Sequence, residues 1–169
     1  MVKSLSRRSA LALLAGATAA PKTALADEVI DLGWEDLLPE GQVVIPRALQ
    51  SLIDHDGPDL SSQQPASTGV RTDWNGRIVR LPGFIVPIDT VGTAVTAFIL
   101  VPYVGACIHV PPPPANQLVF VTTGGKPYES EGLFAPVHVT GMFGVSAMTT
   151  HLAQIGYALS AEKIVPFKV

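Results

Sequence analysis

Cysteine is almost missing from this chain, since Cys107 is the single example among 169 residues. One cysteine excludes a disulfide within the chain, so the fold does not depend on bridges of that kind. Three roles stay open for the lone thiol. It is buried and inert, it forms a bridge to a second chain, or it binds a metal ion.

Long apolar runs and catalytic motifs are also missing. Beyond residue 26 no apolar run reaches the roughly 20 residues that a membrane-spanning helix needs. The sequence contains no G-x-S-x-G, P-loop or dinucleotide-binding motif, and Cys107 has no Asn or Asp orienter in a recognisable setting. We therefore expect no transmembrane segment in the mature chain, and a binding protein rather than an enzyme.

The first 26 residues resemble a twin-arginine export signal. Arg7 and Arg8 lie in a basic stretch, residues 11–20 form an apolar core, and residues 24–26 read Ala-Leu-Ala, a small-residue cleavage site. The core is about half the length that would span a bilayer. We expect cleavage after Ala26 and a periplasmic mature protein.

Basic residues are scarce once the signal is removed. Cleavage takes away four basic residues and no acidic residue, so the formal charge changes from −3 to −7. Binding to a nucleic-acid backbone needs clustered Lys and Arg, so we do not expect nucleic acid as a partner. An acidic protein is compatible with cationic ligands, including metal ions.

From Gly76 onward, β-branched runs alternate with Pro and Gly at the spacing of a small all-β barrel or sandwich. Five strands are predicted, with a longer connection between the third and the fourth. That order matches a five-stranded OB-like Greek-key barrel, and a two-sheet sandwich is the alternative. The predicted strands are residues 77–88, 95–103, 117–123, 137–145 and 156–165.

The region between the signal and these strands carries only weak periodic signals. Residues 34–39 indicate a short turn or helical cap, and residues 45–53 a short helix. His55 lies between two aspartates in a polar loop, where such a triple has no fixed geometry for a metal. The predicted organisation is a signal peptide (1–26), an irregular N-terminal arm (27–75) and the all-β domain (76–169).

The most unusual segment follows the second predicted strand. Its four consecutive prolines, residues 111–114, fix a stiff, polyproline-like rim. Just before them, Cys107 and His109 are two residues apart, and in extended backbone this spacing places both side chains on one face. A thiolate and an imidazole are suitable ligands for Zn(II) or copper.

Two ligands do not complete a metal site, so further donors must come from elsewhere. His138 points out of the barrel if the valines of its strand fill the core, and His151 follows in a loop. Met142 and Met148 add thioethers, although methionine more often fills gaps in a core. The predicted ligands of a Zn(II) or copper ion are Cys107, His109, His138 and His151.

Several blocks together resemble a family of exported bacterial proteins that is catalogued only as a domain of unknown function. The blocks are residues 76–87, residues 98–103, Cys107-Ile-His-Val-Pro-Pro-Pro-Pro-Ala-Asn-Gln117 and residues 137–141. The resemblance implies a lipoprotein or a soluble periplasmic component of an export or metal-uptake system. Because no cysteine stands at the cleavage site, we do not expect a lipid anchor here.

Two functions remain open. The first is a periplasmic zinc or copper carrier or accessory protein that uses Cys107 and His109 with one or two further donors. The second is a metal-free interaction module, in which the proline rim and an exposed strand edge dock a protein of a cell-envelope or transporter complex. In that case Cys107 is buried and His109 bonds to backbone.

Overall fold

The computed structural model describes residues 28–41 and 63–168. The expected signal peptide, the short helix at residues 45–53 and His55 lie outside these residues. The 3-10 helix η1 confirms the turn that residues 34–39 predicted. Along the chain the elements are β1 (Ile30–Asp31), η1 (Glu35–Leu37), β2 (Arg77–Val91), β3 (Ala94–Val101), η3 (Ala115–Gln117), β4 (Val119–Thr122), β5 (Pro136–Thr149) and β6 (Gln154–Pro166).

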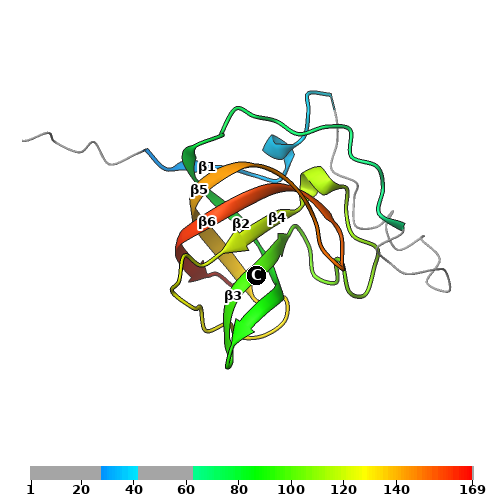
Figure 1. Cartoon of the computed structure of the whole chain (residues 1–169). Helices are drawn as coiled ribbons and strands as arrows, with labels where there is room; N and C mark the ends of the chain where they lie inside the picture. The colour runs from blue at the N-terminus through cyan, green and yellow to red at the C-terminus, as the bar shows by residue number, and fades with distance from the viewer. Residues whose placement is uncertain (1–27, 42–62, 169) are drawn as a thin grey trace, which may run out of the picture.

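Five strands form one sheet that closes into a ring (Figure 1). β2 pairs with β3 and β3 with β4, both antiparallel, β4 runs parallel to β6, β6 pairs with β5, and β5 returns to β2. This is the connectivity of an OB-fold, and it confirms the all-β barrel prediction over the sandwich. β1 adds two residues in parallel to β2. Among the described residues, no helix has the length and apolar character needed to cross a membrane.

β2 closes the ring because it bends. Its first half, from Arg77 to Phe84, pairs with β5, and its second half pairs with β3. Gly83 lies at the bend, where an added Cβ would come within 2.7 Å of the Leu100 side chain. The register then shifts after Pro87. A glycine without room for a side chain, followed by a bulge, is how small barrels turn corners.

The apolar side chains form two clusters on opposite sides of the barrel wall. The inner core fills the ring and includes Val79, Leu81, Phe98 and Tyr157, all fully buried. The outer cluster lies on the outside of β2 and β3. Its buried members are Val86, Ile99, Val101, Ala106, Cys107, Leu118, Ala153 and Ile155.

The arm before the barrel is held by hydrogen bonds between residues far apart in the sequence. The Tyr157 hydroxyl donates to the Leu37 carbonyl (2.8 Å) and accepts the N–H of Arg71 (2.7 Å). The Gln117 side chain donates to the carbonyl of Trp34 (2.9 Å), and the Asn116 side chain donates to that of Gly69 (2.9 Å). Asn116 and Gln117 are buried residues of η3, which explains why the third strand begins two residues later than predicted.

Candidate functional site

The segment around Cys107 turns tightly instead of running straight. The Gly105 carbonyl accepts the N–H groups of Ile108 (3.4 Å), His109 (2.9 Å) and Val110 (3.1 Å). Cys107 has a positive φ of 68°, a conformation that few residues other than glycine adopt. The prediction of extended backbone was therefore wrong here, because Gly105 lets the chain reverse and the cysteine then enters the left-handed region.

The Cys107 side chain packs into the outer cluster and is only 3% exposed. Burial raises the pKa of its thiol to about 12. A thiol binds metals and reacts as the thiolate, so this side chain stays protonated and inert near neutral pH. The structure therefore gives Cys107 the setting of a core residue.

The three predicted histidine ligands are packed separately. His109 is exposed with its ring 6.1 Å from that of Phe134, and His138 is half-buried with its ring 4.8 Å from that of Phe167. His151 is exposed in the turn between β5 and β6. Across residues 28–41 and 63–168, no three His, Cys, Asp or Glu side chains gather in a way that could hold a metal ion.

The prolines form a buried support rather than an exposed rim. Pro111, Pro112 and Pro113 are all buried. The Pro113 carbonyl accepts a hydrogen bond from the Gln64 side chain (2.8 Å), whose oxygen accepts the N–H of Gln154 (2.7 Å). The proline segment thus joins the arm to β6, and its stiffness fixes where the loop lies on the barrel.

This loop covers the surface that OB-folds ordinarily use. Their ligands bind on the face of the second and third strands, between the loops that follow the first and fourth strands. In this chain Ile99 and Val101 of that face are buried in one cluster with Ala106 and Cys107 of the loop. The usual OB ligand face is therefore occupied by the chain's own side chains.

The tip of the β5–β6 hairpin is a second unusual surface. Residues 132–161 contain no Asp, Glu, Lys or Arg, and neither do residues 90–125. The two stretches meet in the structure, because Ile155 of the hairpin belongs to the outer cluster and Met148 and Leu152 pack against it. The absence of charged residues is visible in the sequence. It marks a surface that the predicted metal ligands do not identify.

One edge of this hairpin has no strand partner. β5 pairs with β2 only as far as Phe143, and the Val145 N–H then bonds to the Asn75 side chain (2.8 Å). From residue 146 to residue 149, no strand of the described chain pairs with the side of β5 that faces away from β6. Proteins usually protect such edges with lysine, proline or a bulge, and here only a bulge between Val145 and Met148 is present.

A hollow of about 280 Å³ lies along the hairpin, and we call it the hairpin groove. Gly156 contributes to its floor, where an added Cβ would come within 2.8 Å of the Ala115 carbonyl and 2.9 Å of Val70. Val70 and Val145 are 36% and 37% exposed. The apolar lining comes from Val70, Ala115, Val145, Ala147, Met148 and Ile155.

Comparison with known proteins gives a family but no activity. No curated protein matches the chain. It is similar to a DUF3299 family protein from Pseudomonas aeruginosa PAO1, whose crystal structure was determined at 2.45 Å, with 38% identity and a TM-score of 0.70 over 84% of this chain and 98% of that one. A family model described as "Protein of unknown function (DUF3299)" matches residues 34–166. The chain therefore belongs to the DUF3299 family.

Proposed function

We propose that this chain is a protein-interaction module that binds an extended, uncharged segment of a partner protein. The segment would add as a strand to β5 at residues 146–149 and place apolar side chains in the hairpin groove. The observation that carries the proposal is an unpaired, uncharged strand edge directly beside an apolar groove. These are the two components of recognition by strand addition.

The edge and the groove have separate roles in this proposal. The backbone of residues 146–149 spans about 13 Å and offers N–H and C=O groups for affinity. Every second side chain of an added strand points to the same face, so alternate residues of the partner would enter the groove. The structure thus supports an extended partner segment over a helical one, since a helix satisfies its own backbone.

The lining of the groove selects an apolar, uncharged segment. None of its side chains is charged, and its polar members are Ser67, Thr149 and Gln154. Burying a charged group there without a counter-charge would be costly. Val70 and Val145 lose their partial exposure when a segment binds, which favours binding by burial of apolar area.

The metal-carrier hypothesis draws less support from the geometry. Its central ligand, Cys107, is buried and protonated, and His109 lies outside on the Phe134 ring. Coordination by Cys107 would require the loop to leave the outer cluster. Zinc or copper binding therefore stays a prediction of the sequence.

The partner would be a component of the cell envelope, because we infer export from the twin-arginine signal. Replacing Arg7 and Arg8 by lysine keeps the charge and removes the recognised motif. We expect uncleaved precursor to accumulate in the cytoplasm, as measured by fractionation and mass spectrometry. Normal export of this variant would contradict the twin-arginine route.

Site-specific photocrosslinking in cells tests the partner directly. A photoreactive phenylalanine analogue would replace Val145 in the hairpin groove, and the exposed Thr90 near the end of β2 as the control. We expect a discrete heterologous adduct from position 145 and none from position 90. Equal adducts at both positions, no adduct at position 145, or an adduct with the mass of two copies of this chain would overturn the proposal.

Binding to the purified adduct partner then tests the edge and the groove together. Ala147→Lys places a charge on a residue that belongs to the edge and also lines the groove, and we expect it to weaken binding by about tenfold or more. Thr90→Lys makes the same change on the other hairpin and should leave the affinity unchanged. Calorimetry measures the affinity of both variants for the partner, and circular dichroism checks that each variant is folded. Equal affinities for the two variants would remove this edge and groove as the binding surface.

A further inference from the structure

A second hollow lies at the opening of the barrel, away from the hairpin groove. β4 ends at Thr122, whereas β6 continues to Pro166, so β6 extends beyond the end of its parallel neighbour. Between residues 161–164 of β6 and the loop at residues 123–128 there is a space of about 150 Å³. That is the volume of about five water molecules, enough for a small organic molecule.

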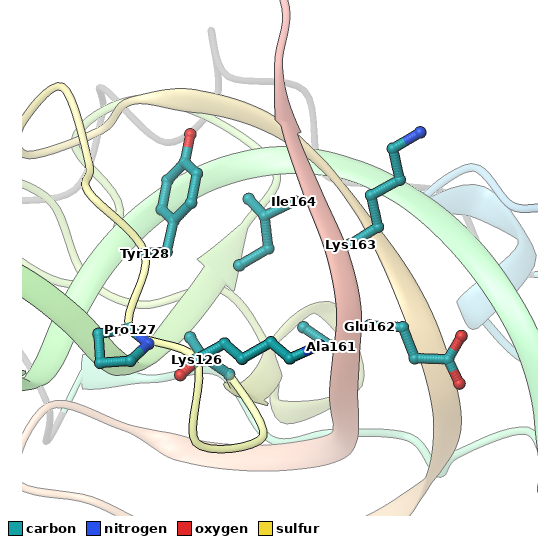
Figure 2. A pocket seen from close by; sticks show the side chains of 8 residues that line it. Lys126, Pro127, Tyr128, Ala161, Glu162, Lys163 and Ile164 are labelled. Atoms are coloured by element: carbon teal, nitrogen blue, oxygen red, sulfur yellow. The ribbon is translucent and has the colours of Figure 1, made fainter.

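Figure 2 shows how the side chains line this space. The Tyr128 ring and Ile164 face each other across it as apolar walls. Lys126 extends from the loop toward β6 near Ala161, whereas Glu162 and Lys163 project to the other side of the strand. Lys126 is therefore the charged side chain of this lining that reaches across the space.

Thr123 lines the same space with an unpaired hydroxyl. The residue is 4% exposed, and its Oγ1 has no hydrogen-bond partner among the described residues. It follows Val119 and Val121 in the alternation of β4, and both valines belong to the inner core. The hydroxyl therefore lies on the barrel side of the wall.

A second unpaired hydroxyl lies on the neighbouring strand. Thr96 accepts the Thr123 backbone N–H at its carbonyl (3.0 Å), so the two residues are opposite each other. Thr96 Oγ1 is also buried without a partner in the described chain. A buried hydroxyl without a partner is unfavourable, so each of these two groups is free to bond to a polar group of a ligand or to water, and Thr123 is the one that lines the space.

We propose that this opening binds a small organic monocarboxylate, with the Thr123 hydroxyl donating to the carboxylate, Lys126 pairing with its charge, and Tyr128 and Ile164 holding its apolar part. One ammonium group matches one negative charge. Burial and the nearby Glu131 raise the pKa of the Tyr128 hydroxyl, so that group stays protonated. The same glutamate repels any anion, and it would repel a doubly charged ligand such as phosphate about twice as strongly as a monocarboxylate.

Titration of the isotopically labelled mature chain, followed by NMR, tests this site. The probes are butyrate and butyramide, which have the same shape but differ in charge. We expect saturable shifts of the amides of residues 123–128 and 161–164 with butyrate, and at least about tenfold weaker binding of butyramide. An acetylated Ala-Val dipeptide, with a free or an amidated C-terminus, distinguishes a peptide terminus from a free small acid.

Variants identify the residues that bind. Thr123→Val and Lys126→Gln should each weaken butyrate binding by about tenfold. Thr123→Ser keeps the hydroxyl and should restore it, and Lys168→Gln is the control because this exposed lysine does not line the space. Equal binding of butyrate and butyramide, absence of saturable shifts, or unchanged affinity in Thr123→Val would overturn the proposal.

A stability measurement separates a ligand from a structural water. If the Thr123 hydroxyl is unpaired without ligand, Thr123→Val should raise the thermal midpoint of the ligand-free chain by about 2–4 °C. Butyrate should then raise the midpoint of the wild type and not that of this variant. A lower midpoint for Thr123→Val without ligand would mean that water satisfies the hydroxyl, and it would end the proposal.

Discussion

The two hairpins of this barrel end in different ways. At the β2–β3 turn, Asp89 accepts the Thr90 N–H (2.9 Å) and Thr93 donates to Glu129 (3.2 Å), so acidic side chains satisfy the exposed groups. At the β5–β6 turn, the neutral hydroxyl of Thr150 accepts the N–H groups of Leu152 (3.2 Å) and Ala153 (3.1 Å). The β2–β3 turn is therefore polar and faces solvent. The β5–β6 turn closes without a charged side chain and packs on the outer cluster.

The difference shows that exposed apolar side chains in one molecule can have two different explanations. Val91 at the first turn is 66% exposed, and a single exposed apolar side chain beside polar neighbours needs no explanation. Val145 on the second hairpin lies beside an unpaired edge and a groove without charge. The combination, rather than the exposure, is why we propose the second hairpin as a binding surface.

The largest expected effect comes from breaking the packing of the second hairpin. Ile155→Ala removes a side chain that is 1% exposed from the outer cluster, so we expect a loss of about 2–5 kcal/mol in the free energy of unfolding. Val91→Ala on the first hairpin should change it by less than about 0.5 kcal/mol. Urea unfolding measures both. Similar losses for the two variants would remove the contrast between the hairpins.

The next effect depends on pH and concerns the cysteine that belongs to the same outer cluster as Ile155. Burial raises the pKa of the Cys107 thiol from 9.0 to about 12, so the folded chain holds this proton more firmly than the unfolded chain. The contribution of this protonated thiol to the free energy of unfolding is complete below pH 9 and is lost as the pH rises toward 12. In that window the wild type should lose about 1.4 kcal/mol per pH unit more than Cys107→Ala.

The control for this prediction is internal, because the buried tyrosines are common to both chains. Urea unfolding at several pH values between 8 and about 11 gives the two slopes. Parallel slopes would show that the thiol is not buried in solution.

A smaller effect on stability, with a visible effect on solubility, is expected at the unpaired edge. Ala147→Lys changes an exposed position, so the free energy of unfolding should change by less than about 0.5 kcal/mol. Self-association at high concentration should decrease, because lysine blocks edge-to-edge pairing. Light scattering compares it with Thr90→Lys. If both variants reduce scattering equally, net charge and not the edge is responsible.

The smallest expected effect separates the two functions that the sequence left open. If Cys107 is a core residue, Cys107→Ser should bind Zn(II) as the wild type does in competition with a chromophoric chelator. We also expect the Zn(II) affinity of the wild type from each of the three histidine variants, His109→Ala, His138→Ala and His151→Ala. Loss of affinity in Cys107→Ser together with any one histidine variant would instead support the metal carrier.

Local patterns in the sequence were enough to predict much of the fold. The start of β2 at Arg77 and the five-strand order follow from β-branched runs between prolines and glycines. The bend at Gly83 and Pro87 follows from residues that interrupt a ladder. These features depend on near neighbours, which a sequence displays directly.

The candidate site depended on features that local patterns do not contain. The spacing of Cys107 and His109 predicts a shared face only in extended backbone, and the turn at Gly105 removes that condition. The burial of the proline loop depends on partners such as Ile155 and Gln64, which are distant in sequence. The uncharged stretches are visible in the sequence, but only the structure shows that they meet.

The Tyr157 hydroxyl has a consequence for how this protein can change in length. Leu37 and Arg71 are both bonded to this one oxygen, so the chain between them begins and ends at one point of the barrel. Before Arg71, Gln64 and Gly69 also bond to Pro113, Gln154 and Asn116. For a loop whose ends are already fixed, each doubling in length costs only about 0.6 kcal/mol. New sequence inserted between Leu37 and Gln64 would keep all of these bonds, and this is where we would attach a reporter or a second domain.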